Sequence, residues 1–179
     1  MTSSPIPNWL GFEFVFARLI DRLVGLTDEE YSWQPVAGSW GIELTDDGRH
    51  RVHSLLPRPD PAPVTTIGWR ICHIGDTLRE ERNWRWLDRE PVLRDAYIDH
   101  PATAAGGTAY LREAYAAWAE LVGSLADDEL FEPLGPVAGP FSDDPKAAFV
   151  VHILDELIHH GAEVALLRDL YRNRATTTD

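Results

Sequence analysis

The chain has 179 residues, of which 44% are hydrophobic and 25% charged, a balance typical of a folded protein with a full apolar core. This length predicts a single domain over residues 1–179. The formal net charge of -13 repels phosphate backbones. Because the sequence contains no basic patch to offset that charge, it argues against nucleic acid as a partner.

The sequence also gives expectations about the cellular setting. Cys72 is the only cysteine, so an intramolecular disulfide is excluded and a reducing compartment is favoured. The first residues lack the basic start and cleavage pattern of a secretory signal. No apolar stretch approaches the roughly 18–20 residues that span a bilayer. We therefore expect a cytoplasmic protein with no membrane partner.

Apolar residues at helical spacing predict a first helix over 9–26. Thr27, followed three residues later by Glu30, then reads as a capping box at the start of a short helical turn. The stretch 34–64 is rich in Pro, Gly and Asp, which predicts one long irregular connection with a short hairpin around 46–48. Loops this long in compact domains often cover a functional site, so we expect a lid here.

Three further helices are predicted in the rest of the chain. Thr65 or Thr66 caps a helix over 67–88, and apolar spacing predicts others over 107–125 and 145–171. Connections rich in Pro and Gly separate them. Four amphipathic helices without a convincing strand pattern predict an all-α fold, a four-helix bundle with two long crossing connections.

Residue spacing in the last predicted helix indicates a metal site. Glu156 and His160 lie four residues apart, so they share one face of that helix. His73, near the apolar face of the helix over 67–88, is the best candidate for a third ligand from a facing helix. Two imidazoles and a carboxylate with an open fourth position form the pattern of catalytic zinc sites, and the set also suits nickel or iron. A buried core histidine and a solvated i, i+4 pair are the alternatives.

Three segments resemble one protein family. "DELIHHGAEVALLRDL" is similar to the last-helix signature of DinB-like (DinB/YfiT) metalloproteins, whose usual form is H-x-x-x-H followed by R-G-Q. "TTIGWRICHIGD" resembles their second-helix motif, with its histidine seven residues after the Ser/Thr, and "LTDEEYSWQPVAGSW" resembles the approach to it. The resemblance covers most of the chain. It implies a four-helix bundle that holds a divalent metal, often zinc or nickel, through His73, Glu156 and His160.

The sequence departs from the usual family pattern at two places. Glu156 stands where most relatives have histidine, and "HGAE" replaces H-R-G-Q. The resulting His/Glu/His triad is similar to that of the mycothiol-dependent maleylpyruvate isomerase branch. That similarity implies a low-molecular-weight thiol as cofactor.

Other polar residues of the last helix receive supporting roles. His152 lies one turn before Glu156 and could support a ligand, contact substrate or lie on the surface. His159 points about 100° away from His160 and is expected on the surface or in a helix contact. Asp155 and Glu163 are expected to support a ligand or to be solvated, and Glu163 is the better candidate because it follows His160 by three residues.

Residues elsewhere in the chain complete the set of candidates. His50 and His53 could approach the site if the long loop folds as a lid, and otherwise are ordinary loop histidines. Trp40 and Trp69 are expected to wall a pocket beside the metal. Cys72 is expected to be a buried small hydrophobe, with a catalytic nucleophile as the alternative.

These expectations lead to a functional hypothesis. Through the resemblance, the chain is expected to be a metal-dependent enzyme acting on a small-molecule substrate through a mycothiol-type thiol, a transferase or isomerase-like protein that forms a homodimer. The alternatives are a metal-dependent hydrolase and a non-catalytic metal- or ligand-binding stress-response protein. A fold hosts many functions, so the sequence assigns no catalytic residue beyond the metal set.

Overall fold

The computed structural model describes residues 11–57, 59–92 and 98–174, and these residues are mostly helical. Within these ranges the α-helices are α1 (Phe12–Leu23), α2 (Asp28–Ser32), α3 (Ile67–Arg79), α4 (Glu81–Trp86), α5 (Ala104–Gly123) and α6 (Lys146–Arg172). The strands are β1 (Ile42–Leu44) and β2 (His50–Val52), and the short 3-10 helices are η3 (Glu129–Phe131) and η4 (Pro136–Phe141). The prediction of an all-α fold is confirmed, and the small hairpin is an addition to it.

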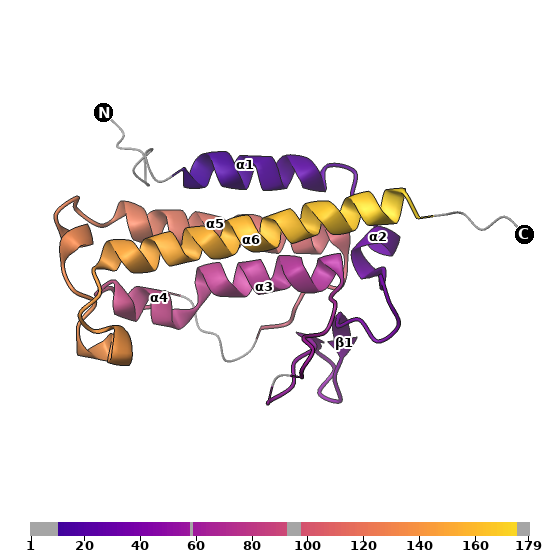
Figure 1. The fold of residues 1–179 in the computed structure, drawn as a ribbon, viewed down its shortest axis with the longest axis horizontal. Coiled ribbons are helices and arrows are strands. Elements are labelled where there is room, and N and C mark those ends of the chain that lie inside the picture. Colours follow the sequence, from indigo (N-terminus) through magenta and orange to yellow (C-terminus); the bar gives the residue numbers. More distant parts are fainter. Residues whose placement is uncertain (1–10, 58, 93–97, 175–179) are drawn as a thin grey trace, which may run out of the picture.

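The longest helices, α1, α3, α5 and α6, run alongside one another (Figure 1). Helix α3 packs against both α5 and α6, and α1 packs against α6. Between them lies an apolar core around Trp118, which is fully buried and has the rings of Phe12 and Phe149 at centroid distances of 5.9 and 6.3 Å. The finer prediction of a four-helix bundle in a single domain rests on this arrangement and stays a prediction.

The helix predicted over 67–88 is two helices in the structure. Its start is as predicted, because Thr66 is the cap and its Oγ1 accepts a hydrogen bond from the Trp69 N–H at 3.1 Å. The chain then leaves helical geometry at Glu80, whose ψ of 130° separates α3 from α4. The side chain of Asn83 donates to the carbonyls of Thr77 (2.8 Å) and Leu78 (3.2 Å), which the break leaves without helical partners. Periodicity alone does not reveal this break, since both segments keep an apolar face.

Close approach of α3 and α5 depends on a small residue. A Cβ at Gly75 would lie 2.3 Å from Cε1 of Tyr110, so only glycine allows the tyrosine ring to cross α3 here. The Tyr110 hydroxyl then reaches Asp76 on the next position of α3 and donates to its Oδ1 at 2.5 Å. This contact fixes one edge of the surface on which the candidate site lies.

The long segment 34–64 contains the predicted hairpin. Strands β1 and β2 pair antiparallel, with Glu43 opposite Arg51, and the turn between them includes Gly48 at φ 77°. Backbone hydrogen bonds join Trp40 to Val64 and Thr66, which ties the base of the segment to the start of α3. The two ends of the segment therefore meet beside the first turn of α3.

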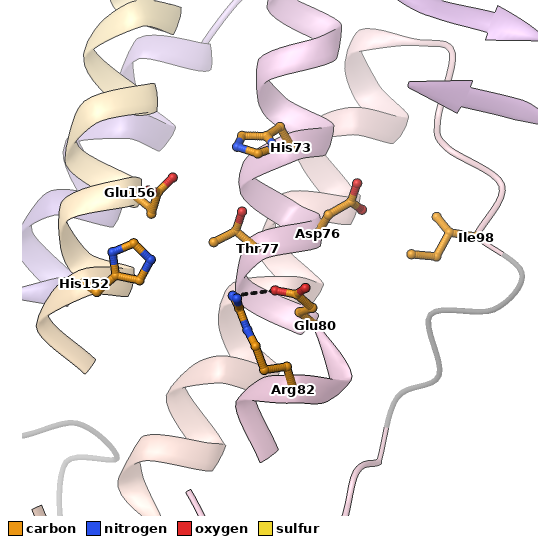
Figure 2. A pocket seen from close by; sticks show the side chains of 8 residues that line it. All are labelled: His73, Asp76, Thr77, Glu80, Arg82, Ile98, His152 and Glu156. Carbon is orange, nitrogen blue, oxygen red and sulfur yellow. Dashed lines mark ion pairs between the residues drawn. The ribbon is translucent and has the colours of Figure 1, made fainter. Parts of the chain in front are cut away.

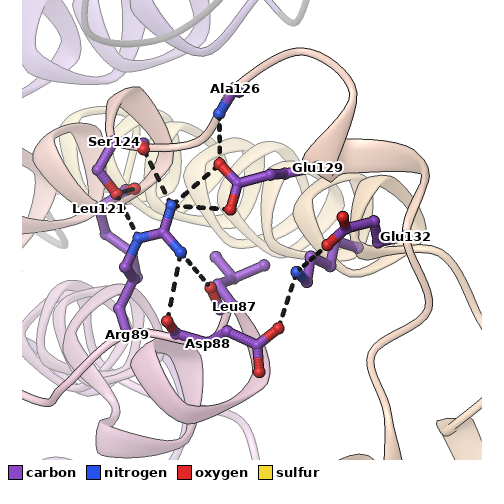
Figure 3. Close-up of polar contacts among 9 residues, drawn as sticks. Leu87, Asp88, Arg89, Leu121, Ser124, Ala126, Glu129 and Glu132 are labelled. Atoms are coloured by element: carbon purple, nitrogen blue, oxygen red, sulfur yellow. Dashed lines mark hydrogen bonds and ion pairs between the residues drawn. The ribbon is translucent and has the colours of Figure 1, made fainter.

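A polar network fixes the first turn of α6 against the neighbouring elements (Figure 3). Arg89, which follows α4, donates from one nitrogen to both carboxylate oxygens of Glu129 in η3 at 3.1 Å each. Lys146 is 1% exposed, and its Nζ lies 2.8 Å from Asp88 and 2.9 Å from Glu132. Because the buried ammonium has two carboxylate partners, its burial is compensated and α6 starts from a fixed point.

A buried ion pair fixes the last turns of α6. Arg168 donates to both carboxylate oxygens of Glu30, at 2.7 and 3.0 Å, and also to the carbonyl of Val24 at 3.1 Å. Thr27 caps α2 as predicted, since its Oγ1 accepts from the Glu30 N–H at 3.2 Å. The Glu30 carboxylate, which a capping box would turn back toward Thr27, is instead engaged by Arg168. No helix in the described ranges is long and apolar enough to cross a membrane.

Candidate metal centre

His73 on α3 and the pair Glu156 and His160 on α6 come together where these helices face each other. One ligand atom of each lies within 4.8 Å of the others, although the three come from positions up to 87 apart in the chain. Nε2 of His160 is 3.1 Å from Oε2 of Glu156, and the two imidazole rings meet edge to face at a centroid distance of 4.6 Å. The sequence-predicted set is therefore assembled in space.

The environment of His73 keeps its imidazole neutral. Burial, together with the nearby His160 and Arg70, lowers the pKa of His73 to about 4, against the opposing effect of Glu156 and Asp76. The indole of Trp69 stacks on the ring at a centroid distance of 4.9 Å and covers one face of it. A neutral imidazole is the form in which histidine binds metal ions.

His160 is oriented by a carboxylate on its other nitrogen. Nδ1 lies 2.6 Å from Oε2 of Glu163, and the same oxygen lies 3.0 Å from Nε of Arg70. We assign the Nδ1–H as donor to Glu163, because that contact is shorter than the 3.1 Å between Nδ1 and Arg70. The lone pair of Nε2 is then directed to the side of Glu156, which is the arrangement of carboxylate-supported metal-binding histidines.

The donor set could hold a metal ion. It offers two imidazoles and one carboxylate, the ligand types of zinc and nickel sites. All three side chains are partly buried, with His160 12% and Glu156 30% exposed. A second group, His159, His160 and Glu163, also lies within metal-binding distance. There the guanidinium of Arg70 already contacts both His160 and Glu163, so its positive charge opposes a cation at that place.

Two cavities border the candidate centre. The first, called the trough, has a volume of about 470 Å³ and runs along α3 between α6 and Ile98 (Figure 2). It is lined by His73, Asp76, Thr77, Glu80, Arg82, Ile98, His152 and Glu156. The second, called the loop-side cavity, has a volume of about 620 Å³ and lies between residues of 52–56 and 59–65 on one side and the helices on the other. His73 and Glu156 line both cavities, so the donor set forms part of the wall between them.

A comparison with protein families agrees with this geometry. The profile described as the DinB superfamily matches residues 12–164, which include all three candidate ligands. The chain belongs to the DinB superfamily. No curated protein and no solved structure matches the chain.

In this DinB-superfamily chain, the other predicted residues of α6 divide into two groups. Glu163 contacts His160 as predicted, whereas Asp155 is exposed and borders the loop-side cavity. His152 is exposed and borders the trough, a position that suits two of its expected roles, a substrate contact and a surface group. His159 is exposed, as predicted, and borders the loop-side cavity.

The residues predicted around the pocket are placed more exactly by the structure. Trp40 and Trp69 both line the loop-side cavity, as expected. His53 stacks on Trp40 at a centroid distance of 5.2 Å, and its carbonyl accepts from Trp69 Nε1 at 2.8 Å, so it supports the wall rather than the metal set. His50 lies 3.6 Å from Asp99.

Cys72 is fully buried, and burial raises the pKa of its thiol to about 12. A thiol in that state is a poor nucleophile, so the expected reading of Cys72 as a small hydrophobe agrees with the structure.

Sequence reasoning missed two groups beside the metal set. Arg70 lies one turn before His73 on α3, and that helical spacing was the available signal. Asp76 accepts from Tyr110 and lies 3.0 Å from Nε2 of buried His100, which makes a hydrogen-bonded group at the edge of the trough. His100 comes from a segment without helical pattern, so no spacing rule connects it to α3.

Proposed function

We propose that this DinB-superfamily protein binds one divalent metal ion through His73, Glu156 and His160 and uses it in a thiol-dependent transfer or isomerisation. The observation that carries the proposal is the assembled donor set, in which a partly buried neutral imidazole and a carboxylate-supported imidazole share a small volume with Glu156. We propose zinc as the ion, with nickel as the alternative that the same ligands accept. We further propose a mycothiol-type small thiol as the cofactor.

The two cavities support transfer between two molecules. Because His73 and Glu156 line both the trough and the loop-side cavity, one molecule can reach the donor set from each side. A hydrolase needs such access for one substrate and water only. The loop-side cavity has Arg70 and two tryptophans in its wall, groups that suit a polar thiol of moderate size.

A divalent ion in this place supplies Lewis-acid chemistry, which lowers the pKa of a thiol that binds beside it. The residues of the chain prepare the site for this chemistry. Trp69 covers His73 and limits the access of water to it, while Glu163 fixes the ring of His160. Arg70 pairs with Glu163 and keeps that carboxylate on the Nδ1 side of His160. Substrate and thiol would therefore meet a rigid donor set.

The first test is the metal content of protein purified without added metal. We expect about one zinc or nickel ion per chain, and loss of the ion in His160→Ala. The matched control is His159→Ala, which removes the neighbouring imidazole, 62% exposed, and should leave the metal content unchanged. A metal content far below one ion per chain, unchanged in His160→Ala, would contradict the proposed metal site.

The second test separates thiol transfer from the alternatives. Mycothiol should slow the removal of metal by a chelator, and the loaded protein should couple it to 1-chloro-2,4-dinitrobenzene with release of chloride. Turnover of an ester with water, without a thiol requirement, would favour hydrolysis. A full metal site with neither reaction would favour the non-catalytic binding protein. The expected homodimer and cytoplasmic location remain predictions, and light scattering tests the former.

A further inference from the structure

A third cavity, called the aromatic pocket, has a volume of about 420 Å³ and lies beside α4 and the first turns of α6. Its wall includes Trp86, Phe141, Phe149 and Ala148. The ring of Trp86 lies 4.9 Å from that of Phe149 and 6.0 Å from that of Phe141, and Phe141 is 53% exposed. An apolar concavity of this size with exposed aromatic edges is typical of small-molecule sites.

The aromatic pocket continues the trough. Arg82 and His152 line both cavities, so the two share part of their wall. On α6, Phe149, His152 and Glu156 follow one another at about one-turn intervals, which puts about 10 Å along the helix axis between the aromatic pocket and the candidate metal centre. A ligand that reaches from one to the other is therefore elongated, with its middle beside Arg82 and His152.

Arg82 determines what the middle of such a ligand carries. Its guanidinium lies over the rings of Trp86 and Phe149, at 5.1 and 5.8 Å, and NH2 lies 2.5 Å from Oε2 of Glu80. Its Nε is buried and has no hydrogen-bond acceptor within the described residues. A buried N–H between aromatic rings requires an acceptor oxygen, and a bound ligand can supply one.

We infer that the trough and the aromatic pocket form one site for an aryl-substituted carboxylate or carbonyl compound, as the second substrate of the proposed transfer. Its aryl group occupies the aromatic pocket, and its acceptor oxygen binds Arg82. The identity of the reacting end rests on the proposed function. The binding of the aryl end does not, because no candidate metal ligand lines the aromatic pocket.

The test is calorimetric titration of the full chain, with and without zinc, using 4-phenylbutyrate as the probe. Butyrate lacks the aryl group, 4-phenyl-2-butanone keeps a carbonyl oxygen without charge, and 4-phenylbutan-1-ol lacks both. Ala148→Phe fills the aromatic pocket from an exposed position, and Val151→Phe adds the same group at an exposed position of α6 that borders none of the three cavities. Arg82→Gln removes the proposed donor.

We expect saturable binding of 4-phenylbutyrate in both zinc-free and zinc-loaded protein, and none of butyrate. Ala148→Phe should weaken binding by about tenfold or more, while Val151→Phe should change it by less than about twofold. Arg82→Gln should weaken the carboxylate and the ketone more than the alcohol, and a larger effect on the carboxylate than on the ketone identifies the acid as the preferred class.

Absence of 4-phenylbutyrate binding, or binding that Ala148→Phe leaves within about twofold, overturns the inference. If Ala148→Phe loses its helical circular dichroism, Phe141→Ser at the exposed rim provides the same comparison. If the protein proves unable to hold a metal ion but still binds the probe, the pocket is supported and only the proposed function is overturned. A protein that retains metal but does not bind the probe gives the opposite result, so the two failures are distinguishable.

Discussion

Replacing Glu163 by Gln tests how the chain prepares His160 for a metal ion. The variant keeps an acceptor oxygen of similar size but removes the charge that faces Nδ1 of His160 at 2.6 Å and Arg70 at 3.0 Å. A hydrogen bond to a neutral acceptor is about 1 kcal/mol weaker than one to a carboxylate. The unpaired guanidinium of Arg70, 3.1 Å from Nδ1, opposes the ion by about 1 kcal/mol more, because both groups are partly exposed.

Together these losses predict roughly thirtyfold weaker zinc binding, which lies within the range of about 10- to 100-fold for supporting contacts to metal ligands. The assay is competition with a fluorescent zinc chelator at pH 7.5, compared with Asp155→Asn. That control removes an equal charge from an exposed residue that lines the loop-side cavity with His160, and zinc affinity should stay within about twofold. Equal affinities of Glu163→Gln and wild type would refute the assigned role of Glu163.

Three further outcomes are expected. Burial raises the pKa of the Cys72 thiol to about 12, so this cysteine should resist iodoacetamide in the native protein. Rapid labelling of native protein, measured by mass spectrometry, would contradict that expectation. Cys72→Ala should keep its metal. The pKa of His73 is lowered to about 4 from 6.5, so the unfolded chain binds the proton at a higher pH than the folded chain does. The free energy of unfolding of the metal-free protein, measured in urea, should therefore fall by at most about 3 kcal/mol between pH 6.5 and pH 4. His73→Asn should make that free energy depend less on pH over the same range. Arg168→Met removes the bidentate partner of buried Glu30 and leaves it only Arg172, whose Nε is 3.9 Å away. The free energy of unfolding should fall by about 3–5 kcal/mol in the same assay, and adding Glu30→Met should recover most of it; a loss below about 1 kcal/mol would refute this.

The sequence predicts the helices and the donor set because both follow from regular spacing. The face shared by Glu156 and His160, the cap at Thr66 and the hairpin turn at 46–48 are local patterns, and each appears in the structure. The third candidate ligand, His73, follows from its place near the apolar face of another helix and from the family resemblance, since no spacing rule connects two helices.

Features that depend on tertiary contacts cannot be predicted from the spacing of residues in the sequence. The break at Glu80 is satisfied by the side chain of Asn83, and the carboxylate of Glu30 is turned to Arg168 by a partner 138 positions away. The shape of the loop-side cavity depends on how residues 52–56 and 59–65 lie against the helices, which periodicity does not encode. Arg82 appears in the sequence as an ordinary charged residue, and its position between two cavities emerges only from packing.

The same contacts around His160 would also satisfy an imidazolium that bridges Glu156 and Glu163 in a purely structural role. The measurement that decides between the two is anomalous diffraction from a crystal of protein purified without chelator or added metal. The proposed function predicts one anomalous peak within bonding distance of His73, Glu156 and His160, with an absorption edge that identifies zinc or nickel. A map without a peak at these three side chains, from protein that also contains no metal in solution, would contradict it.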